Sequence, residues 1–272
     1  MTTHPNTADG SGLAVALEHA EGLVLARLHH VPANPLSPVV LEGLDAAAEA
    51  VERSGAAALV IASGLDGFFA AGADIKYMRT LDGAGFAAYG RRMREVFARL
   101  ADLDALTVAA IEGLALGGGL ELALACKLRI GSPAARLGVP EIKLGLIPGA
   151  GGTQRLPRVI GRSRALDLLV TGRQVEGSEA HAIGLLDRLV DDGQAEAVAC
   201  DIARRVMGFS APALRATDRC LDAAFTMELT DGIAFEAAQE RALFEHGEAS
   251  EGIAAFVERR GPVFASAARG DR

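Results

Sequence analysis

The pattern of apolar and polar residues predicts strands and helices that alternate through the first two thirds of the chain. Short β-prone runs bounded by glycine or polar residues indicate strands, and apolar residues at helical spacing indicate the helices between them. The alternation is typical of an α/β fold. We expect strands at residues 13–18, 23–28, 57–62, 106–111, 128–131 and 185–190, and helices at 38–54, 75–81, 86–100, 153–160 and 164–170.

From residue 195 onward the pattern changes to helices alone. We expect them at about residues 195–208, 212–226, 231–246 and 250–260, separated by Gly, Ser and Pro. Helices with apolar stripes at the end of such a chain often pack against another subunit. We therefore divide the chain into a flexible tail (1–12), an α/β core with the active site (13–190) and a helical region for oligomerisation (191–272).

One stretch, residues 112–125, combines three consecutive glycines with a carboxylate inside the apolar run that follows them. Gly117, Gly118 and Gly119 let a backbone approach a ligand closely, and the free N–H groups of the helix that follows favour negative charge. Glu121 lies in this helix with Leu or Ala on every face. A lone buried carboxylate costs several kcal/mol unless something compensates it. The stretch therefore predicts an anion site with an unusual carboxylate beside it.

A second carboxylate, Glu141, follows 141 − 121 = 20 residues later, directly after Pro140, which bars a regular helix there. This separation lets the chain leave the helix, pass one strand and return, so the two carboxylates can meet over one site. Two carboxylates around one water molecule can divide general-acid and general-base work. The glycines can supply half of an oxyanion hole, and the small residues of segment 69–76 the other half.

Each residue also has a simpler interpretation when it is taken alone. Glu121 can be a helix carboxylate held by a neighbouring arginine or by backbone, and Glu141 a surface-loop residue. Asp74 can cap a helix, and Lys76 and Arg259 can be solvated charges. Residues 149–153 resemble a phosphate loop without its Gly-Lys-Ser/Thr ending, so we interpret them as a structural turn. The combination of features, more than any one of them, favours catalysis.

Composition narrows the classes of function. A net charge of −8 argues against a general nucleic-acid surface, since phosphate binding needs clustered Lys and Arg. The three cysteines and six histidines show no metal-ligand spacing, which predicts no metal site and a reducing compartment. No apolar run reaches the roughly 18 residues that span a membrane, and the first residues carry no targeting pattern. We expect a cytoplasmic protein with neither nucleic-acid nor membrane partners.

Four motifs in order resemble the crotonase superfamily, specifically the enoyl-CoA hydratases, over roughly residues 13–265. They are FAAGADI (69–75), ALGGGLELA (115–123), PEIKLGLIPGAGGTQRLP (140–157) and AFVER (255–259). The resemblance implies the α/β crotonase-like fold, a spiral of ββα units with a helical C-terminal trimerisation region. It also implies a homotrimer or a homohexamer made of two trimers.

The resemblance further implies roles for single residues. The backbone N–H groups of Ala73 and Gly118 would form the oxyanion hole. Glu121 and Glu141 would hold the water that adds across the C2–C3 double bond of a trans-2-enoyl-CoA, giving a 3-hydroxyacyl-CoA. Glu141 would give its proton to C2, while Glu121 orients and deprotonates the water, although coupled carboxylates blur this division.

The substrate itself would carry coenzyme A, so the resemblance implies no further cofactor. Segment 77–104, which shapes the acyl pocket in the family, matches least well, so the preferred acyl chain length stays open. Two alternatives also stay open: an isomerase of 3-enoyl-CoA, and a non-catalytic acyl-CoA-binding or RNA-binding member of the family. The positions that match coenzyme A contacts are Ala71, Asp74, Ile75, Lys76, Gly117, Phe256 and Arg259.

Overall fold

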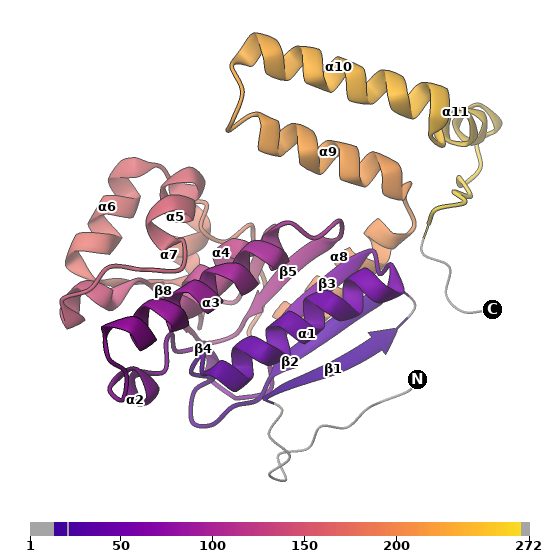
Figure 1. Ribbon diagram of the computed structural model, residues 1–272. Coiled ribbons are helices and arrows are strands. Elements are labelled where there is room, and N and C mark those ends of the chain that lie inside the picture. The colour runs from indigo at the N-terminus through magenta and orange to yellow at the C-terminus, as the bar shows by residue number, and fades with distance from the viewer. Residues whose placement is uncertain (1–13, 21, 268–272) are drawn as a thin grey trace. The chain divides into compact units, whose positions relative to one another are not determined.

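The computed structural model describes residues 14–20 and 22–267 (Figure 1). The predicted tail at residues 1–12 lies outside the described residues. The chain divides into two compact units, Met1–Ala203 and Arg204–Arg272. The first unit thus continues past residue 190, where the composition changes, and includes most of helix α8 (Ala195–Met207).

In the described part of the first unit, the larger sheet has six strands in the order β1-β2-β3-β5-β7-β10. Strands β1 and β2 pair antiparallel, and the other neighbours are parallel. The register places Leu25, Val60, Val108 and Leu128 in one row across four strands. The strands are β1 (Val15–Ala20), β2 (Leu23–Leu28), β3 (Ala58–Ser63), β5 (Leu106–Ile111), β7 (Leu128–Gly131) and β10 (Arg188–Leu189).

A second sheet, with four strands among the described residues, has the order β4-β6-β8-β9. Its members are β4 (Phe68–Ala70), β6 (Leu114–Leu116), β8 (Arg136–Gly138) and β9 (Gln174–Glu176). Strands β3 and β4, β5 and β6, and β7 and β8 are consecutive pairs that contribute one strand to each sheet, and a helix follows each pair. The predicted ββα units and α/β class are therefore confirmed. The sequence pattern predicts none of the short strands of this second sheet.

The helices begin and end largely where residue chemistry predicts. Helix α1 starts at Pro38 and ends at Gly55, whose φ of 66° suits glycine. The Asp82 side chain caps α3 by accepting a hydrogen bond from Gly85 N. Pro140 opens a 3₁₀ helix, η1, so Glu141 lies in a tight helical turn rather than in an extended loop. The elements of the first unit are α1 (Pro38–Ser54), α2 (Ile75–Met78), α3 (Gly83–Ala101), α4 (Gly118–Ala125), η1 (Pro140–Leu144), α5 (Gly152–Ile160), α6 (Arg162–Thr171) and α7 (Gly177–Ala182).

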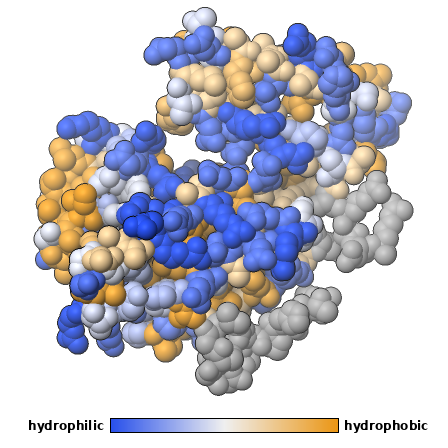
Figure 2. Space-filling view, in the orientation of Figure 1, coloured by the Kyte–Doolittle hydropathy of each residue, from blue (hydrophilic) through white to orange (hydrophobic). Residues whose placement is uncertain are grey.

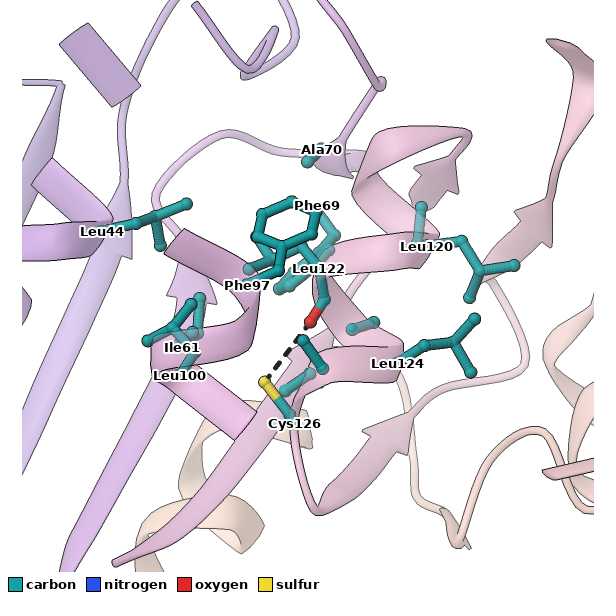
Figure 3. Packing of buried hydrophobic residues seen from close by; sticks show 14 of the residues in the cluster. Leu44, Ile61, Phe69, Ala70, Phe97, Leu100, Leu120, Leu122, Leu124 and Cys126 are labelled. Atoms are coloured by element: carbon teal, nitrogen blue, oxygen red, sulfur yellow. Dashed lines mark hydrogen bonds between the residues drawn. The ribbon is translucent and has the colours of Figure 1, made fainter. Parts of the chain in front are cut away.

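The core of the first unit surrounds α4. All eight residues of this helix are buried, as expected for a helix that is apolar on every face. Figure 3 shows part of the cluster, in which Phe69 of β4, Phe97 of α3 and Leu122 of α4 pack together. Cys126 lies at the end of α4, with its Sγ 3.6 Å from the Leu122 carbonyl oxygen. This packing holds the start of α4 in a fixed position.

The second unit consists of helices with little buried surface of their own. It contains α9 (Ala211–Ala223), α10 (Leu229–His246) and α11 (Ala249–Glu258), and α9 packs along α10 (Figure 1). None of the residues described in α10 is buried. Apolar side chains are visible on both units in Figure 2, including those over α6 on the left. The large exposed apolar residues of the second unit are Phe209, Leu221, Phe225, Met227, Leu229, Ile233, Phe244, Ile253, Phe256, Val257 and Val263. No helix in the described ranges is long and apolar enough to cross a membrane.

Candidate active site

The glycine triplet forms the junction between β6 and α4, where the backbone passes very close to other groups. Gly117 has φ 53° and ψ −124°, and a Cβ there would lie 2.6 Å from Oε1 of Glu141. A Cβ on Gly119 would lie 2.0 Å from the carbonyl oxygen of Ala70. Both positions therefore require glycine.

The loop that carries Ala73 lies against the first residues of α4. A Cβ on Gly118 would lie 3.4 Å from Ala73 N, and a Cβ on Gly72 would lie 3.5 Å from Gly118 N. Gly118 is the first residue of α4, so its N–H has no acceptor within the helix. Neither this N–H nor that of Ala73 donates to another residue that the structure describes. Two free backbone donors thus lie side by side, on Ala73 and Gly118, the residues for which the family resemblance implied an oxyanion hole.

Glu121 is held from one side by backbone donors. Its side chain is 2% exposed, and its Oε1 accepts hydrogen bonds from Ala150 N and Gly152 N, both at 2.7 Å. Burial raises the pKa of Glu121, and these two hydrogen bonds oppose the rise because they stabilise the carboxylate. Gly152 begins α5, where free N–H groups favour negative charge. Backbone donors therefore supply much of the compensation that a buried carboxylate needs.

Two arginines anchor the loop that supplies these donors. Arg94 of α3 donates to the carbonyl oxygen of Gly149 at 2.9 Å, and Arg155 of α5 donates to that of Ala150 at 3.2 Å. The positive charges of Arg155 and Arg94 also lower the pKa of Glu121. Residues 149–153 are thus more than the structural turn that the sequence suggested. Every residue except proline has a backbone N–H group, so residue type does not reveal these donors. Only their position at the start of a predicted helix could have indicated them.

Glu141 has a different environment from Glu121. Burial raises the pKa of Glu141 to about 7, and the negative charge of Glu121 contributes to the rise. Its Oε2 atom is buried and makes no hydrogen bond to any residue that the structure describes. A carboxyl group in this condition can hold a proton near neutral pH.

The two carboxyl groups lie close enough to interact, since the negative charge of Glu121 helps to raise the pKa of Glu141. Both residues contact Gly117: its carbonyl oxygen accepts a hydrogen bond from Glu121 N at 3.0 Å, and a Cβ on it would lie 2.6 Å from Oε1 of Glu141. The structure therefore brings together Glu121 and Glu141, as the spacing predicted. Glu121 has an oxygen occupied by two backbone donors, whereas Glu141 has an oxygen without a partner among the described residues.

The predicted coenzyme A contacts divide between the two units. In the first unit, Ala71, Asp74, Ile75 and Lys76 lie on one segment around Ala73, and Ala71, Ile75 and Lys76 are exposed. Asp74 caps α2, since its Oδ1 accepts a hydrogen bond from Tyr77 N at 3.0 Å. Its backbone is also engaged, since Asp74 N donates to the Tyr89 hydroxyl at 3.1 Å and its carbonyl oxygen accepts a hydrogen bond from Met78 N at 2.8 Å.

The remaining two predicted contacts lie in the second unit, on or at the end of α11. The side chain of Phe256 is 85% exposed. Arg259 ends the helix with φ 55°.

Comparison with known proteins places this geometry in a family. A profile described as enoyl-CoA hydratase/isomerase matches residues 18–267. The chain belongs to the enoyl-CoA hydratase/isomerase, or crotonase, family. Membership agrees with the paired sheets and C-terminal helices, and it implies acyl-CoA substrates.

Relatives in this family differ in their named reactions. A probable enoyl-CoA hydratase of Rhizobium meliloti is 37% identical over 231 residues, which cover 85% of this chain and 89% of the relative. The mitochondrial methylglutaconyl-CoA hydratase of Mus musculus is also 37% identical, over 85% of this chain and 75% of the relative. The crystal structure of enoyl-CoA hydratase from Bacillus anthracis is 31% identical, with a TM-score of 0.89 over 93% of this chain and 99% of that one.

Proposed function

We propose that this protein adds water across the C2–C3 double bond of trans-2-enoyl-CoA thioesters to form 3-hydroxyacyl-CoA. The observation that carries the proposal is the contrast between the two carboxyl groups. Glu121 has one oxygen saturated by two N–H donors, whereas Glu141 has a pKa raised to about 7 and an oxygen without a partner. Hydration needs both a proton acceptor and a proton donor, while isomerisation of a 3-enoyl-CoA can proceed with one carboxylate.

In this proposal the N–H groups of Ala73 and Gly118 bind the thioester oxygen, where negative charge develops as the enolate forms. The α4 dipole adds to this stabilisation. One O–H bond of the water breaks, its oxygen bonds to C3, and its proton passes to Glu121. Glu141 gives a proton to C2. Proton exchange between the two carboxyl groups and solvent then restores the starting state.

Coenzyme A recognition completes the proposal. The segment from Ala71 to Lys76 and the backbone of Gly117 would contact the coenzyme A part of the substrate, and Phe256 and Arg259 would complete the site from a neighbouring subunit. The exposed apolar side chains of α9, α10 and α11 support burial against other copies of the chain. We propose a cytoplasmic homotrimer or homohexamer in which residues 13–190 catalyse and residues 191–272 assemble the oligomer.

The test is an assay of the purified protein with trans-2-enoyl-CoA thioesters of increasing chain length. We expect loss of the ultraviolet absorbance of the conjugated thioester and incorporation of oxygen from labelled water at C3. Absence of turnover with every thioester would contradict the proposal. Conversion of 3-enoyl-CoA to 2-enoyl-CoA without uptake of water would instead assign an isomerase. Binding of RNA at physiological salt, with no thioester turnover, would assign the non-catalytic alternative.

A further inference from the structure

Tyr89 of α3 connects three segments that are far apart in the sequence. Its side chain is buried, and its hydroxyl donates a hydrogen bond to the carbonyl oxygen of Leu36 at 2.6 Å. The same hydroxyl oxygen accepts a hydrogen bond from Asp74 N at 3.1 Å. Burial raises the pKa of Tyr89 to about 12, so the phenol stays neutral and keeps the proton that it donates. Tyr89 lies in the segment where the family motifs match least well.

These hydrogen bonds clamp the residue that supplies one of the two free N–H groups. The Leu36 N–H donates to the carbonyl oxygen of Gly72 at 2.8 Å. This carbonyl belongs to the same peptide group as the Ala73 N–H. The next peptide group, between Ala73 and Asp74, is held by Tyr89. The two peptide groups that flank Ala73 are thus held by Leu36 N and by Tyr89, and the Tyr89 hydroxyl also donates to the Leu36 carbonyl oxygen.

We propose that Tyr89 is a positioning residue for the oxyanion hole, whose hydroxyl aims the Ala73 N–H at the thioester oxygen. The proposal rests on the proposed function of Ala73 and Gly118. An N–H that is displaced by a fraction of an ångström loses much of its effect on a developing charge, because the hydrogen bond must be formed in the transition state.

The chain contains a matched control. Its only other tyrosine, Tyr77, packs against Tyr89 edge to face, with ring centroids 5.3 Å apart and an interplanar angle of 80°. The Tyr77 hydroxyl makes no hydrogen bond to any residue in the described ranges. Tyr77→Phe therefore removes a hydroxyl from the same aromatic pair but leaves both hydrogen bonds of the Tyr89 hydroxyl in place.

The first experiment compares Tyr89→Phe and Tyr77→Phe in hydration kinetics. We expect kcat to fall about tenfold to a hundredfold in Tyr89→Phe, with KM changed less than about threefold, because the lost effect belongs to the transition state. Tyr77→Phe should match the wild type. Wild-type kcat in Tyr89→Phe, or an equal loss in both variants, would overturn the proposal.

The second experiment does not depend on turnover. Butyryl-CoA labelled with ¹³C at the thioester carbonyl is saturated and cannot be hydrated. Its carbonyl resonance should move downfield on binding to the wild type and to Tyr77→Phe, because the hole polarises the carbonyl, and should move less in Tyr89→Phe. An equal displacement in all three proteins would overturn the positioning role. A protein that polarises butyryl-CoA in a Tyr89-dependent way but hydrates no enoyl-CoA would retain this role and contradict the proposed reaction alone.

A third measurement covers the case in which Tyr89→Phe does not fold. Tyr77→Phe labelled with [4-¹³C]tyrosine has one labelled residue, Tyr89. We expect its resonance to move when butyryl-CoA is added and to stay in place when coenzyme A without an acyl group is added. Only butyryl-CoA has a thioester oxygen that can accept a hydrogen bond from Ala73 N, next to the peptide group that Tyr89 holds. A resonance that responds equally to both ligands, or to neither, would overturn the proposal.

Discussion

Glu121 and Glu141 belong to two contrasting regions of the first unit. Glu121 lies in α4, where every residue is buried, and neighbouring backbone occupies one of its oxygens. Glu141 lies in η1, where no residue that the structure describes is fully buried, yet one of its oxygens is enclosed without a partner. Burial raises the pKa of both groups, but only Glu121 receives compensating donors from other residues. The comparison teaches that the two carboxyl groups differ in the partners of their oxygens more than in the direction in which burial shifts their pKa.

The strongest test of this contrast removes each carboxylate in turn. We expect Glu121→Gln and Glu141→Gln each to lower kcat for hydration about 10² to 10⁴-fold, the usual contribution of a general acid or base. The glutamine oxygen can still accept the bonds from Ala150 and Gly152, so Glu121→Gln should remain folded. The measurement is turnover of a 2-enoyl-CoA, with exposed Glu95→Gln as the control and circular dichroism to verify folding. Wild-type turnover in either variant would remove that residue from the mechanism.

A second test breaks the junction between the two regions. Ala at position 117 would force its Cβ to within 2.6 Å of Glu141 Oε1, so we expect Gly117→Ala to displace that carboxyl group and to lower kcat about tenfold to a hundredfold. Gly55→Ala is the control, because Gly55 also has positive φ but its Cβ would meet nothing within 4 Å. That variant should lose about 1 kcal/mol of stability and keep its turnover. Equal kcat in both variants would show that Glu141 need not lie against Gly117.

A third test sharpens the assignment of the proton donor. In the proposed reaction Glu141 must be protonated to act, and burial raises its pKa to about 7. We therefore expect kcat/KM to fall as pH rises through about 7, approaching tenfold for each further pH unit. The same group affects stability. Its folded-state pKa lies above the ordinary value of 4.5, so its contribution is fully present below pH 4.5 and is lost as pH rises through about 7.

Glu141→Gln should therefore flatten the dependence of the unfolding free energy on pH in that window, measured by urea titration. The control is Glu95→Gln, which should keep the wild-type slope. A kcat/KM profile that stays level to pH 9 would assign the donor role elsewhere.

The smallest effect is expected from the support around Glu121. Arg94→Gln removes a partly solvated contact with the Gly149 carbonyl and one positive charge that lowers the pKa of Glu121. Exposed contacts of this kind contribute up to about 1 kcal/mol, so we expect kcat to fall about twofold to fivefold. Arg91→Gln on the same helix is the control. A loss as large as that of Glu121→Gln would mean that Arg94 contacts the substrate directly.

Sequence pattern predicted the long elements well and the short ones poorly. Strands Leu106–Ile111 and Leu128–Gly131 have the predicted bounds, and the four C-terminal helices match to within a few residues. The three-residue strands of the second sheet were missed because so few residues show no periodicity. The strand predicted at residues 185–190 covers only Arg188–Leu189, because only these two residues pair with β7.

Residue types and their order along the chain determined which groups this protein can use: three glycines at the start of an apolar helix, one carboxylate within that helix and another after Pro140. They also determined the α/β core, because local patterns of apolar residues set where its strands and helices form. Only the tertiary structure decided which backbone N–H groups are free, which hold Glu121, and that Tyr89 ties α3 to the Ala73 loop. The physical reason is that hydrogen-bond partners and burial arise from segments distant in sequence, and these set the pKa and orientation of each group.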